Sequence, residues 1–364
     1  REQEDSEMQL RAYRPSDCAQ MAELFVERMR AAELVYAYKK EYGLPILDAK
    51  REAAVIERNA SAIEDEVLRG YYIDFLRDVM AVSRAYQYRM QSGLKVAYSG
   101  VEGAFAHIAA GRIFPEANRI PYRDFASAYD AVVRGESDFA VLPIENSYAG
   151  EVGQTIDLLF TGTLYVNGIY ELKICQNLLG VPGSTVADIR RVTSHPQALS
   201  QCHDYIALHG FTTEEASNTA IAAKTVAASG DKTLGAIASV ETAELYGLQV
   251  LDTNIHKSAE NTTRFAVLSK VRADTPAYTN SVLMFSVKNE AGTLANAIGI
   301  IGKYGYNMTA LRSRPLKDHS WQYYFYVELD GSTDTDDGKR MMQELGAVCD
   351  KLKLAGTFAP HTEI

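Results

Sequence analysis

The sequence has few of the features that mark several common classes of protein. It contains 4 cysteines in 364 residues, at positions 18, 175, 202 and 349, and none forms a CxxC pair. Neither a disulfide framework nor a zinc site is therefore indicated, and buried free thiols are expected. No apolar run approaches the roughly 18 residues of a membrane span. The opening REQEDSEMQL is acidic and polar, unlike a signal peptide. These absences predict a cytoplasmic protein with no membrane partner.

An excess of positive charge is also absent. The formal net charge of −10 argues against nucleic acid as a partner. It leaves room for anionic small molecules, because a local cationic pocket can form in an acidic protein. A chain of 364 residues is too long for one compact core, so two or three domains are expected.

The first ninety residues are predicted to be helical. Between residues 18 and 90 the only proline is Pro45, and the only glycines are Gly43 and Gly70. Gly43 and Pro45 predict a helix end, and Asp48 lies near the start of the next helix. A second break is expected near Gly70, which leaves three helices and no strand.

Polar residues in this region recur at helical spacing. Those expected to share a face are Arg28 with Lys39, Asp48 with Arg51 and Glu52, and Ser83 with Gln87. For any one of them, a solvated face of a helical bundle is an alternative interpretation. Together with the Glu27–Arg28 segment and the run GLPILDAKRE at residues 43–52, the pattern resembles the AroQ class of chorismate mutase.

That resemblance implies a rearrangement of chorismate to prephenate. The reaction is pericyclic, so it needs cations that hold the carboxylates and the ether oxygen, not a nucleophile. By resemblance, the residues involved are Arg28 and Arg11 at the carboxylates, Lys39 and Gln87 at the ether oxygen, and Glu52, Asp48 and Ser83 around the ring hydroxyl, with Arg51 assisting. Helices of two chains interlock in this class, so a homodimer or homotetramer is expected. Because proline is costly inside a helix, the first helix is expected to begin at Pro15 and leave Arg11 outside it.

From residue 94 onwards, short apolar strands alternate with helices. Strands are expected at 95–98, 139–142, 192–194 and 234–239, and helices at 103–112, 125–134, 196–208 and 219–228. This alternation predicts an α/β sheet with helices on both faces, in two halves with a site between them. The strand at 139–142 is expected to stop at Pro143, because proline cannot continue a central strand.

Polar residues follow several of these strands. Glu145, Asn146 and Ser147 come just after one, where α/β sheets often present a ligand site, although an ordinary strand-to-loop corner is an alternative. His195 can be a base or only a helix cap. Asn218 precedes a helix whose free N–H groups suit a carboxylate, with plain capping as the alternative.

Five segments in order resemble prephenate dehydratase across residues 94–270. They are YSGVEGAF at 98–105, LPIEN at 142–146, SHPQ to QC at 194–202, NTA at 218–220 and TRF at 263–265. The resemblance implies that prephenate loses water and carbon dioxide to give phenylpyruvate, in steps that need no metal or other cofactor. The residues it implies are Thr263 nearest the chemistry with Glu145 and Asn146, then Ser147, Ser194, Gln201, Asn218, Thr219, Arg264 and Phe265 around the substrate.

The last ninety residues follow a βαββαβ order. Strands are expected at 281–287, 308–314 and 323–329, helices at 291–303 and 335–352, and a short strand last. This ferredoxin-like order resembles the ACT domain, which binds amino acids and implies L-phenylalanine as effector. The matching residues are Asn289, Gly292, Thr293 and Leu294, then Ser313, Arg314 and Pro315. Two positions depart from the resemblance: Arg312 stands where a glutamate is usual, and Ala291 where a proline is usual.

The sequence therefore predicts a multidomain protein. Residues 1–92 form an all-α three-helix mutase module, residues 93–270 an α/β two-lobed dehydratase domain, and residues 271–364 a ferredoxin-like α+β (βαββαβ) ACT domain. The predicted function is a bifunctional enzyme acting on chorismate and prephenate, regulated by phenylalanine. The alternatives are a monofunctional prephenate or arogenate dehydratase with a weak or vestigial mutase module, and a two-lobed ligand-binding or sensor protein without catalysis.

Overall fold

The chain divides into two compact units, Arg1–Gly93 and Leu94–Ile364. The computed structural model describes residues 15–257, 261–273, 275, 277–316, 322–360 and 362–364, except for the side chains of residues 15–18. Among these residues, no helix combines the length and the apolar character that crossing a membrane requires.

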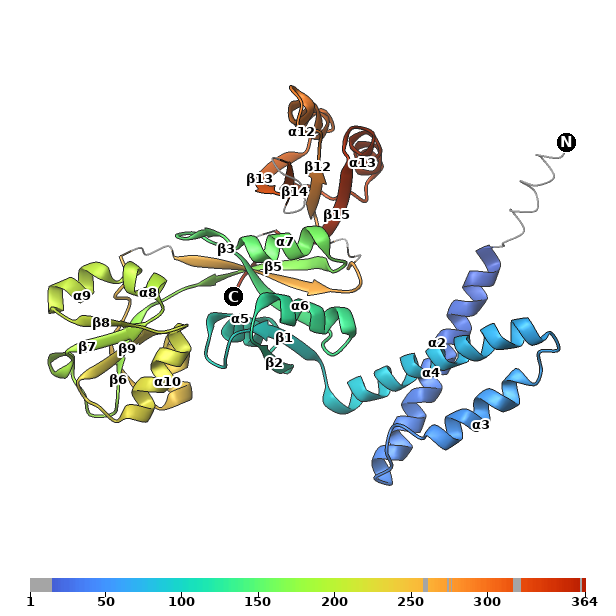
Figure 1. Ribbon diagram of the computed structural model, residues 1–364, viewed down its shortest axis with the longest axis horizontal. Coiled ribbons are helices and arrows are strands. Elements are labelled where there is room, and N and C mark those ends of the chain that lie inside the picture. Colours follow the sequence, from blue (N-terminus) through green and yellow to red (C-terminus); the bar gives the residue numbers. More distant parts are fainter. Residues whose placement is uncertain (1–14, 258–260, 274, 276, 317–321, 361) are drawn as a thin grey trace. The chain divides into compact units, whose positions relative to one another are not determined.

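The first unit contains three helices in the residues that the structure describes (Figure 1). They are α2 (Pro15–Glu41), α3 (Ala49–Ala60) and α4 (Glu66–Ser92). The described residues start at Pro15, which already lies in α2, so the predicted helix start at Pro15 stays a prediction, and Arg11 lies outside the described residues. Asp48 is the N-cap of α3, because its side chain accepts a hydrogen bond from the Arg51 N–H at 3.0 Å.

The predicted break at Gly70 is wrong, because Gly70 lies inside α4. The break falls at residues 61–65, where Asp65 caps α4 by accepting hydrogen bonds from the N–H groups of Val67 and Leu68. A glycine inside a helix costs only about 1 kcal/mol, which the packing of α4 against its neighbours can outweigh.

The second unit begins with a lobe built on the larger sheet. Its strands are β1 (Lys95–Ser99), β2 (Asn118–Tyr122), β3 (Phe139–Asn146), β4 (Gly150–Glu151), β5 (Tyr165–Lys173) and β11 (Thr262–Ser269), in the order β5-β11-β3-β1-β2 with β4 beside β3. Its helices are α5 (Phe105–Ile113), α6 (Phe125–Arg134) and α7 (Gly153–Thr161). The helices α6 and α7 cover one face of the sheet and α5 covers the other.

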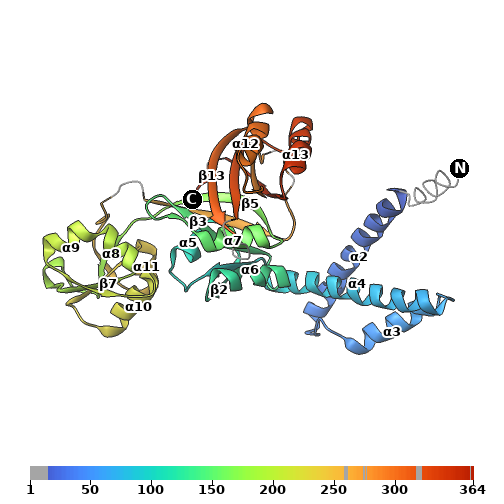
Figure 2. The same ribbon diagram turned by 45° about the horizontal axis from the view of Figure 1, so that its top comes forward.

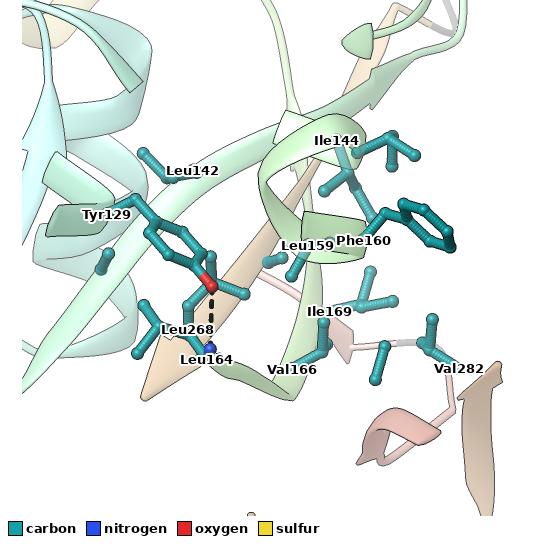
Figure 3. Packing of buried hydrophobic residues seen from close by; sticks show 14 of the residues in the cluster. Tyr129, Leu142, Ile144, Leu159, Phe160, Leu164, Val166, Ile169, Leu268 and Val282 are labelled. Atoms are coloured by element: carbon teal, nitrogen blue, oxygen red, sulfur yellow. Dashed lines mark hydrogen bonds between the residues drawn. The ribbon is translucent and has the colours of Figure 1, made fainter. Parts of the chain in front are cut away.

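Figure 3 shows the core under α6 and α7. The Tyr129 ring is buried against Leu142 and Leu268, and its hydroxyl accepts a hydrogen bond from the Leu164 backbone N–H at 2.8 Å. A buried tyrosine is stable in such a core because its one polar atom has a partner.

Contrary to the prediction, β3 does not end at Pro143 but continues to Asn146. Phe265 of β11 pairs with Pro143 and Arg264 pairs with Glu145, so Ile144 is an extra residue that forms a β-bulge. A bulge is one of the few positions inside a sheet that tolerate proline, because the hydrogen-bond ladder is already interrupted there.

The second lobe is built on a separate sheet of 5 strands. They are β6 (Asn177–Gly180), β7 (Arg191–Ser194), β8 (Thr212–Glu215), β9 (Leu234–Ala238) and β10 (Gln249–Asp252). A short 3₁₀ turn spans Val186–Asp188, and the helices are α8 (Pro196–Gln201), α9 (His203–His209), α10 (Thr219–Ser229) and α11 (Val240–Tyr246). Figures 1 and 2 show α8 and α9 on one side of this sheet and α10 on the other.

The C-terminal region has the predicted βαββαβ order. Its elements are β12 (Asn280–Ser286), α12 (Thr293–Lys303), β13 (Asn307–Pro315), β14 (Tyr323–Asp330), α13 (Asp336–Val348) and β15 (Lys351–Phe358). The sheet order is β13-β14-β12-β15, antiparallel throughout, and α12 and α13 share one core on one face (Figure 1).

This C-terminal sheet joins the sheet of the first lobe. Gly356 of β15 and the short strand β16 (Thr362–Glu363) both pair with β5. A side chain at Gly356 would collide with the backbone of Val166, so only glycine lets these strands approach. Through this join, a single continuous sheet runs from the first lobe into the C-terminal region.

Two candidate active sites

The first candidate site is a cavity of about 250 Å³ in the helical unit. Every residue predicted for this site, apart from Arg11, lines it: Arg28, Lys39, Asp48, Arg51, Glu52, Ser83 and Gln87. Arg11 lies outside the described residues. The residues come from all three helices and from the α2–α3 connection, so helices distant in sequence supply one site.

Hydrogen bonds between elements hold the cavity's polar groups. Arg28 Nε on α2 donates to Ser83 Oγ on α4 at 3.0 Å. Lys39 Nζ donates to the Ile46 carbonyl oxygen in the α2–α3 connection. Gln87 is only 6% exposed, and its side-chain oxygen has no hydrogen-bond partner among the described residues. A buried amide that lacks a partner is costly, so this group is suited to a ligand.

Sequence reasoning missed Arg84, which also lines this cavity. Its guanidinium pairs with the Glu52 carboxylate, and both side chains are about one-quarter exposed, at 27% and 25%. Arg84 lies three residues before Gln87 on α4, a spacing that could have placed both on one face. Arg84 raises the number of cationic side chains around the cavity, which favours an anionic ligand.

The second candidate site is a cavity of about 280 Å³ between the two lobes of the second unit. Thr263, Asn146, Gln201, Asn218 and Thr219 line it, as predicted. Asn146 and Thr263 belong to β3 and β11 of the first lobe, whereas the others belong to the second lobe. The structure therefore brings together side chains from two separate sheets.

A chain of amides and one hydroxyl runs along this cavity. Asn146 Nδ2 donates to Thr263 Oγ1 and to Asn261 Oδ1, both at 2.9 Å. Asn261 in turn donates to Gln201 Oε1 at 3.0 Å. Asn146 Oδ1 accepts from the backbone N–H groups of residues 148 and 149. These contacts leave the Asn146 amide little freedom, so the Thr263 hydroxyl is held in one place.

The N-terminus of α10 also faces the cavity. Asn218 is its N-cap and accepts a hydrogen bond from the Ile221 N–H at 2.8 Å, and Thr219 is the first helical residue. The remaining free N–H groups and the helix dipole favour an anion at this end. A carboxylate of a ligand in the cavity suits this position.

Glu145 and Arg264 do not lie where the sequence predicted. Neither lines the cavity, and their side chains pair with each other at 3.2 Å. The reason is the two-residue period of strands: Asn146 faces Thr263 on one side of the sheet, so the adjacent pair Glu145 and Arg264 points to the other.

Three other predicted residues also lie outside the cavity lining. Ser194 is fully buried and donates to the Ile237 carbonyl oxygen at 2.6 Å. Phe265 belongs to the core against α5. Ser147 Oγ accepts a hydrogen bond from the Thr262 N–H at 3.0 Å. The two hydroxyl groups therefore make hydrogen bonds within the scaffold, and the Phe265 ring packs in the core. Residue type alone does not distinguish such structural roles from substrate binding.

Several residues that line the cavity were not predicted to bind substrate. They are Phe105, Phe125, Gln176, His195 and Gln197. His195 combines both roles considered for it, since it caps α8 by accepting from the Gln197 N–H at 3.2 Å and also lines the cavity. Gln176 is 3% exposed, and its side-chain oxygen has no hydrogen-bond partner within the part of the chain that the structure describes. No local signal identifies Gln176, because it lies in the crossover between lobes.

The residues predicted for an effector lie in two places at one end of the C-terminal sheet. Gly292 caps α12 with a φ of 87°, a left-handed conformation that favours glycine, and Thr293 Oγ1 donates to the Lys288 carbonyl oxygen. Ser286, Tyr324 and Arg314 are successive partners across β12, β14 and β13. The turn after β12 and the end of β13 therefore share an edge, with β14 between them.

Comparisons with known proteins decide the family. A family model described as prephenate dehydratase matches residues 96–273, and one described as chorismate mutase type II matches residues 19–88. The bifunctional chorismate mutase/prephenate dehydratase of Neisseria gonorrhoeae is 31% identical over 316 residues, which cover 85% of this chain and 85% of that protein. The chain belongs to this bifunctional family. It is an enzyme with a chorismate mutase domain and a prephenate dehydratase domain, and it belongs to phenylalanine biosynthesis.

Other relatives match about three quarters of the chain. Arogenate dehydratase/prephenate dehydratase 2 of Arabidopsis thaliana is 32% identical over 74% of this chain and 74% of its own length. A prephenate dehydratase from Arthrobacter aurescens, solved in complex with L-Phe, is 25% identical with a TM-score of 0.68, covering 73% of this chain and 90% of that one. A protein described as a quorum quenching acylase, GqqA, is 32% identical with a TM-score of 0.68, covering 73% and 97%.

Proposed function

We propose that the helical cavity rearranges chorismate to prephenate and that the cavity between the lobes converts prephenate to phenylpyruvate. The observation that carries this proposal is that residues predicted for the two reactions line two separate cavities: all the described mutase residues line the first, and Thr263, Asn146, Gln201, Asn218 and Thr219 line the second. We further infer domains at residues 1–92, 93–270 and 271–364, the last two sharing one sheet.

In the helical cavity, catalysis is electrostatic. Arg28 and Arg11 are proposed to hold the two carboxylates of chorismate, and Lys39 and the side-chain N–H of Gln87 to donate to the ether oxygen as negative charge develops there. Glu52, Asp48 and Ser83 would surround the ring hydroxyl, with Arg51 and Arg84 adding positive charge. Fixed charges of this kind stabilise a transition state without reorganising when it forms.

We propose that a second copy of the chain covers the outside of this helical unit. Large apolar side chains lie exposed on its helices, among them Leu34 at 75%, Tyr71 at 72% and Val67 at 69%. Apolar surface of this extent normally marks an interface. Light scattering of the purified chain should give a dimer or tetramer, and a monomer at micromolar concentration would contradict this interface.

In the cavity between the lobes, the enzyme must protonate the departing ring hydroxyl. The carbon–oxygen bond breaks to release water, the ring carboxylate leaves as carbon dioxide, and its electron pair completes the aromatic ring. Thr263 Oγ1 accepts a hydrogen bond from Asn146, so its own proton is free to point toward the substrate. We propose that Thr263 donates to the departing hydroxyl, while the α10 N-terminus holds the pyruvyl carboxylate.

The test is to assay chorismate and prephenate separately. Purified chain given chorismate should form prephenate, and chain given prephenate should form phenylpyruvate. Arogenate is the informative third substrate, because it differs from prephenate only in carrying an amine in place of the side-chain ketone. Turnover of arogenate without turnover of prephenate would overturn the choice of substrate, and no prephenate formation from chorismate would overturn the mutase half.

We propose that the C-terminal domain is an ACT domain whose effector is L-phenylalanine. Support comes from its ferredoxin-like order and from the L-Phe bound to the Arthrobacter relative. The proposed effector residues are Asn289, Gly292, Thr293 and Leu294, with Ser313, Arg314 and Pro315. The Arg314 guanidinium is held by Asp157 and Glu151 of the dehydratase domain, both at 2.7 Å.

A further inference from the structure

Four charged side chains form a cluster where the dehydratase domain meets the C-terminal domain. We call Glu145, Arg264, Arg312 and Glu328 the interdomain ion cluster. Arg264 donates to both carboxylate oxygens of Glu328, at 3.0 and 2.8 Å, and lies 3.2 Å from Glu145. Arg312 lies 2.6 Å from Glu145 and 3.7 Å from Glu328. Each arginine therefore contacts both carboxylates.

The cluster lies on the reverse side of the strand pair that carries the proposed catalytic groups. Asn146 pairs with Thr263 across β3 and β11, and Glu145 with Arg264 is the next pair along the same ladder. Because neighbouring residues of a strand point to opposite faces, Thr263 and Asn146 face the cavity while the cluster faces away from it. Arg312 and Glu328 come from β13 and β14 of the C-terminal domain.

Burial makes the cluster rigid. The Glu328 side chain is 3% exposed and also accepts a hydrogen bond from the buried Tyr326 hydroxyl at 2.8 Å. Arg312 stacks over the Tyr326 ring, with its guanidinium carbon 5.3 Å from the ring centroid. Burial alone would raise the pKa of Glu145, but hydrogen bonds and charge from Arg312 and Arg264 hold it below its ordinary value. Removing one member would leave each opposite charge with one partner in the cluster in place of two.

Nothing in the dehydration chemistry itself calls for this cluster. Glu145 was expected in the cavity, but the structure places its side chain against Arg312. The ACT resemblance leads one to expect a glutamate, not an arginine, at position 312. A glutamate at position 312 would face Glu145 and Glu328 with a like charge. The arginine is therefore matched to the two carboxylates of this chain.

We propose that Arg312 and Glu328 are positioning residues for dehydration. They hold Glu145 and Arg264, and through the shared strand pair they keep Thr263 and Asn146 in place, so the C-terminal domain contributes to turnover without any effector. This inference rests on the proposed roles of Thr263 and Asn146. Small displacements of a catalytic group cost large factors in rate, so the contribution falls mainly on kcat and not on KM.

A double-mutant cycle tests the proposal with the full chain and no effector. The variants are Arg312→Gln, Glu145→Gln and the two combined, with kcat and KM measured on prephenate. Each single variant should lower kcat by about tenfold or more and change KM by less than about threefold. The combined variant should resemble the single variants within about twofold, because both residues belong to one cluster and their mutual contact, at 2.6 Å, is lost in each of the three variants. Effects on kcat that multiply would overturn the proposal, as would an Arg312→Gln variant with the parent kcat.

Controls separate positioning from a general loss of structure. Arg272→Gln removes an arginine whose bidentate partner, at 2.7 and 2.9 Å, is Asp334, a residue outside the interdomain ion cluster, and it should keep the parent kcat. The chorismate mutase rate of every variant should stay unchanged, since that site lies in the other unit. Arg312→Lys keeps the cation but loses the guanidinium that contacts two carboxylates and stacks on Tyr326, so its kcat should fall between those of the parent and the Gln variant. A Lys variant as slow as the Gln variant would overturn charge pairing as the means. A parent chain inactive on prephenate would overturn the proposed function, whereas an active parent with an unaffected Arg312→Gln variant overturns this inference alone.

Discussion

At the scale of single residues, the face of the element decides function more than the residue type does. Glu145 and Asn146 are neighbours in sequence, yet Asn146 lines the cavity between the lobes and Glu145 lies on the other face of β3. On α4, Ser83 and Gln87 share a face, as their spacing predicted, and both line the helical cavity. The periods of helices and strands therefore decide which polar residues line a cavity and which lie on another face of the element.

Arg28 provides a direct test of the helical site. Replacing it by alanine removes a cation from the cavity and breaks its hydrogen bond to Ser83. Prephenate formation from chorismate should fall about 100- to 1,000-fold, because a fixed charge that stabilises the transition state is lost. Turnover of supplied prephenate should stay near the parent rate. The matched control is Arg30→Ala, an exposed residue of the same helix that does not line the cavity. Loss of both activities in Arg28→Ala would contradict separate sites.

Thr263→Val tests the dehydratase chemistry. The substitution removes the hydroxyl and nearly preserves the shape of the side chain. Phenylpyruvate formation should fall about 100-fold or more, as expected for loss of a group that transfers a proton. The mutase rate serves as the internal control. The matched control variant is Thr262→Val, because Thr262 lies on the same strand but does not line the cavity. Normal phenylpyruvate output from Thr263→Val would remove this hydroxyl from the mechanism.

At the scale of elements, the C-terminal domain holds α7 from its middle to its C-terminal end. Arg314 of β13 binds Asp157 in the middle of the helix. At its C-terminal end, Lys353 of β15 donates to the carbonyl oxygens of Leu159 and Gly162, and Lys351 to that of Phe160. Cations at the C-terminal end of a helix interact favourably with the helix dipole, and they donate hydrogen bonds to carbonyl groups that lack partners within the helix. Val152, the N-cap of α7, lines the cavity between the lobes. The helix that the C-terminal domain holds therefore also forms part of that cavity.

Lys353 should make stability depend on pH in an unusual direction. Burial, with the charge of Lys351 beside it, lowers the pKa of Lys353 to about 8 from an ordinary 10.5. Between these values the unfolded chain keeps a proton that the folded chain has lost, so stability rises with pH across this window. Relative to Lys353→Met, the parent should gain on the order of 3 kcal/mol of unfolding free energy from pH 7 to 10.5.

Urea unfolding of the two proteins at several pH values measures this gain. Lys339→Met, which removes an exposed lysine, controls for the loss of one positive charge. A difference between the parent and Lys353→Met that stays constant across the window would contradict the assignment of this titration to Lys353.

At the scale of the whole molecule, regulation requires that the effector prefer one arrangement of the chain over another. L-phenylalanine should lower the rate of prephenate dehydration, and saturating effector should weaken apparent prephenate affinity by about 5- to 150-fold. By linkage, prephenate or an inert analogue should weaken phenylalanine binding by the same factor. D-phenylalanine is the control for stereospecific binding. Absence of any response to L-phenylalanine in rate and in calorimetric binding would contradict the ACT assignment.

Features of the fold that depend on neighbouring residues could be predicted from the sequence, whereas features that depend on tertiary packing or strand pairing could not. Asp48 at the start of a helix was predicted correctly, because capping involves only neighbouring residues. The break assigned to Gly70 was wrong because tertiary packing outweighs the propensity of one residue. Pro143 was predicted to end a strand, and only the pairing with β11 reveals the bulge that accommodates it.

By itself, the sequence determined the two reactions, the three-helix module, the α/β lobes, the βαββαβ order and part of the polar lining of each cavity. It could do so because short motifs and the periods of helices and strands are read from adjacent positions. The tertiary structure alone decided which face each strand residue occupies and which charges meet across domains. Glu145 and Arg264 lie 119 residues apart in the chain, and Arg312 is more distant still. Their contact depends on strand register and on the join between β15 and β5, which are set by the packing of the whole unit and not by local sequence.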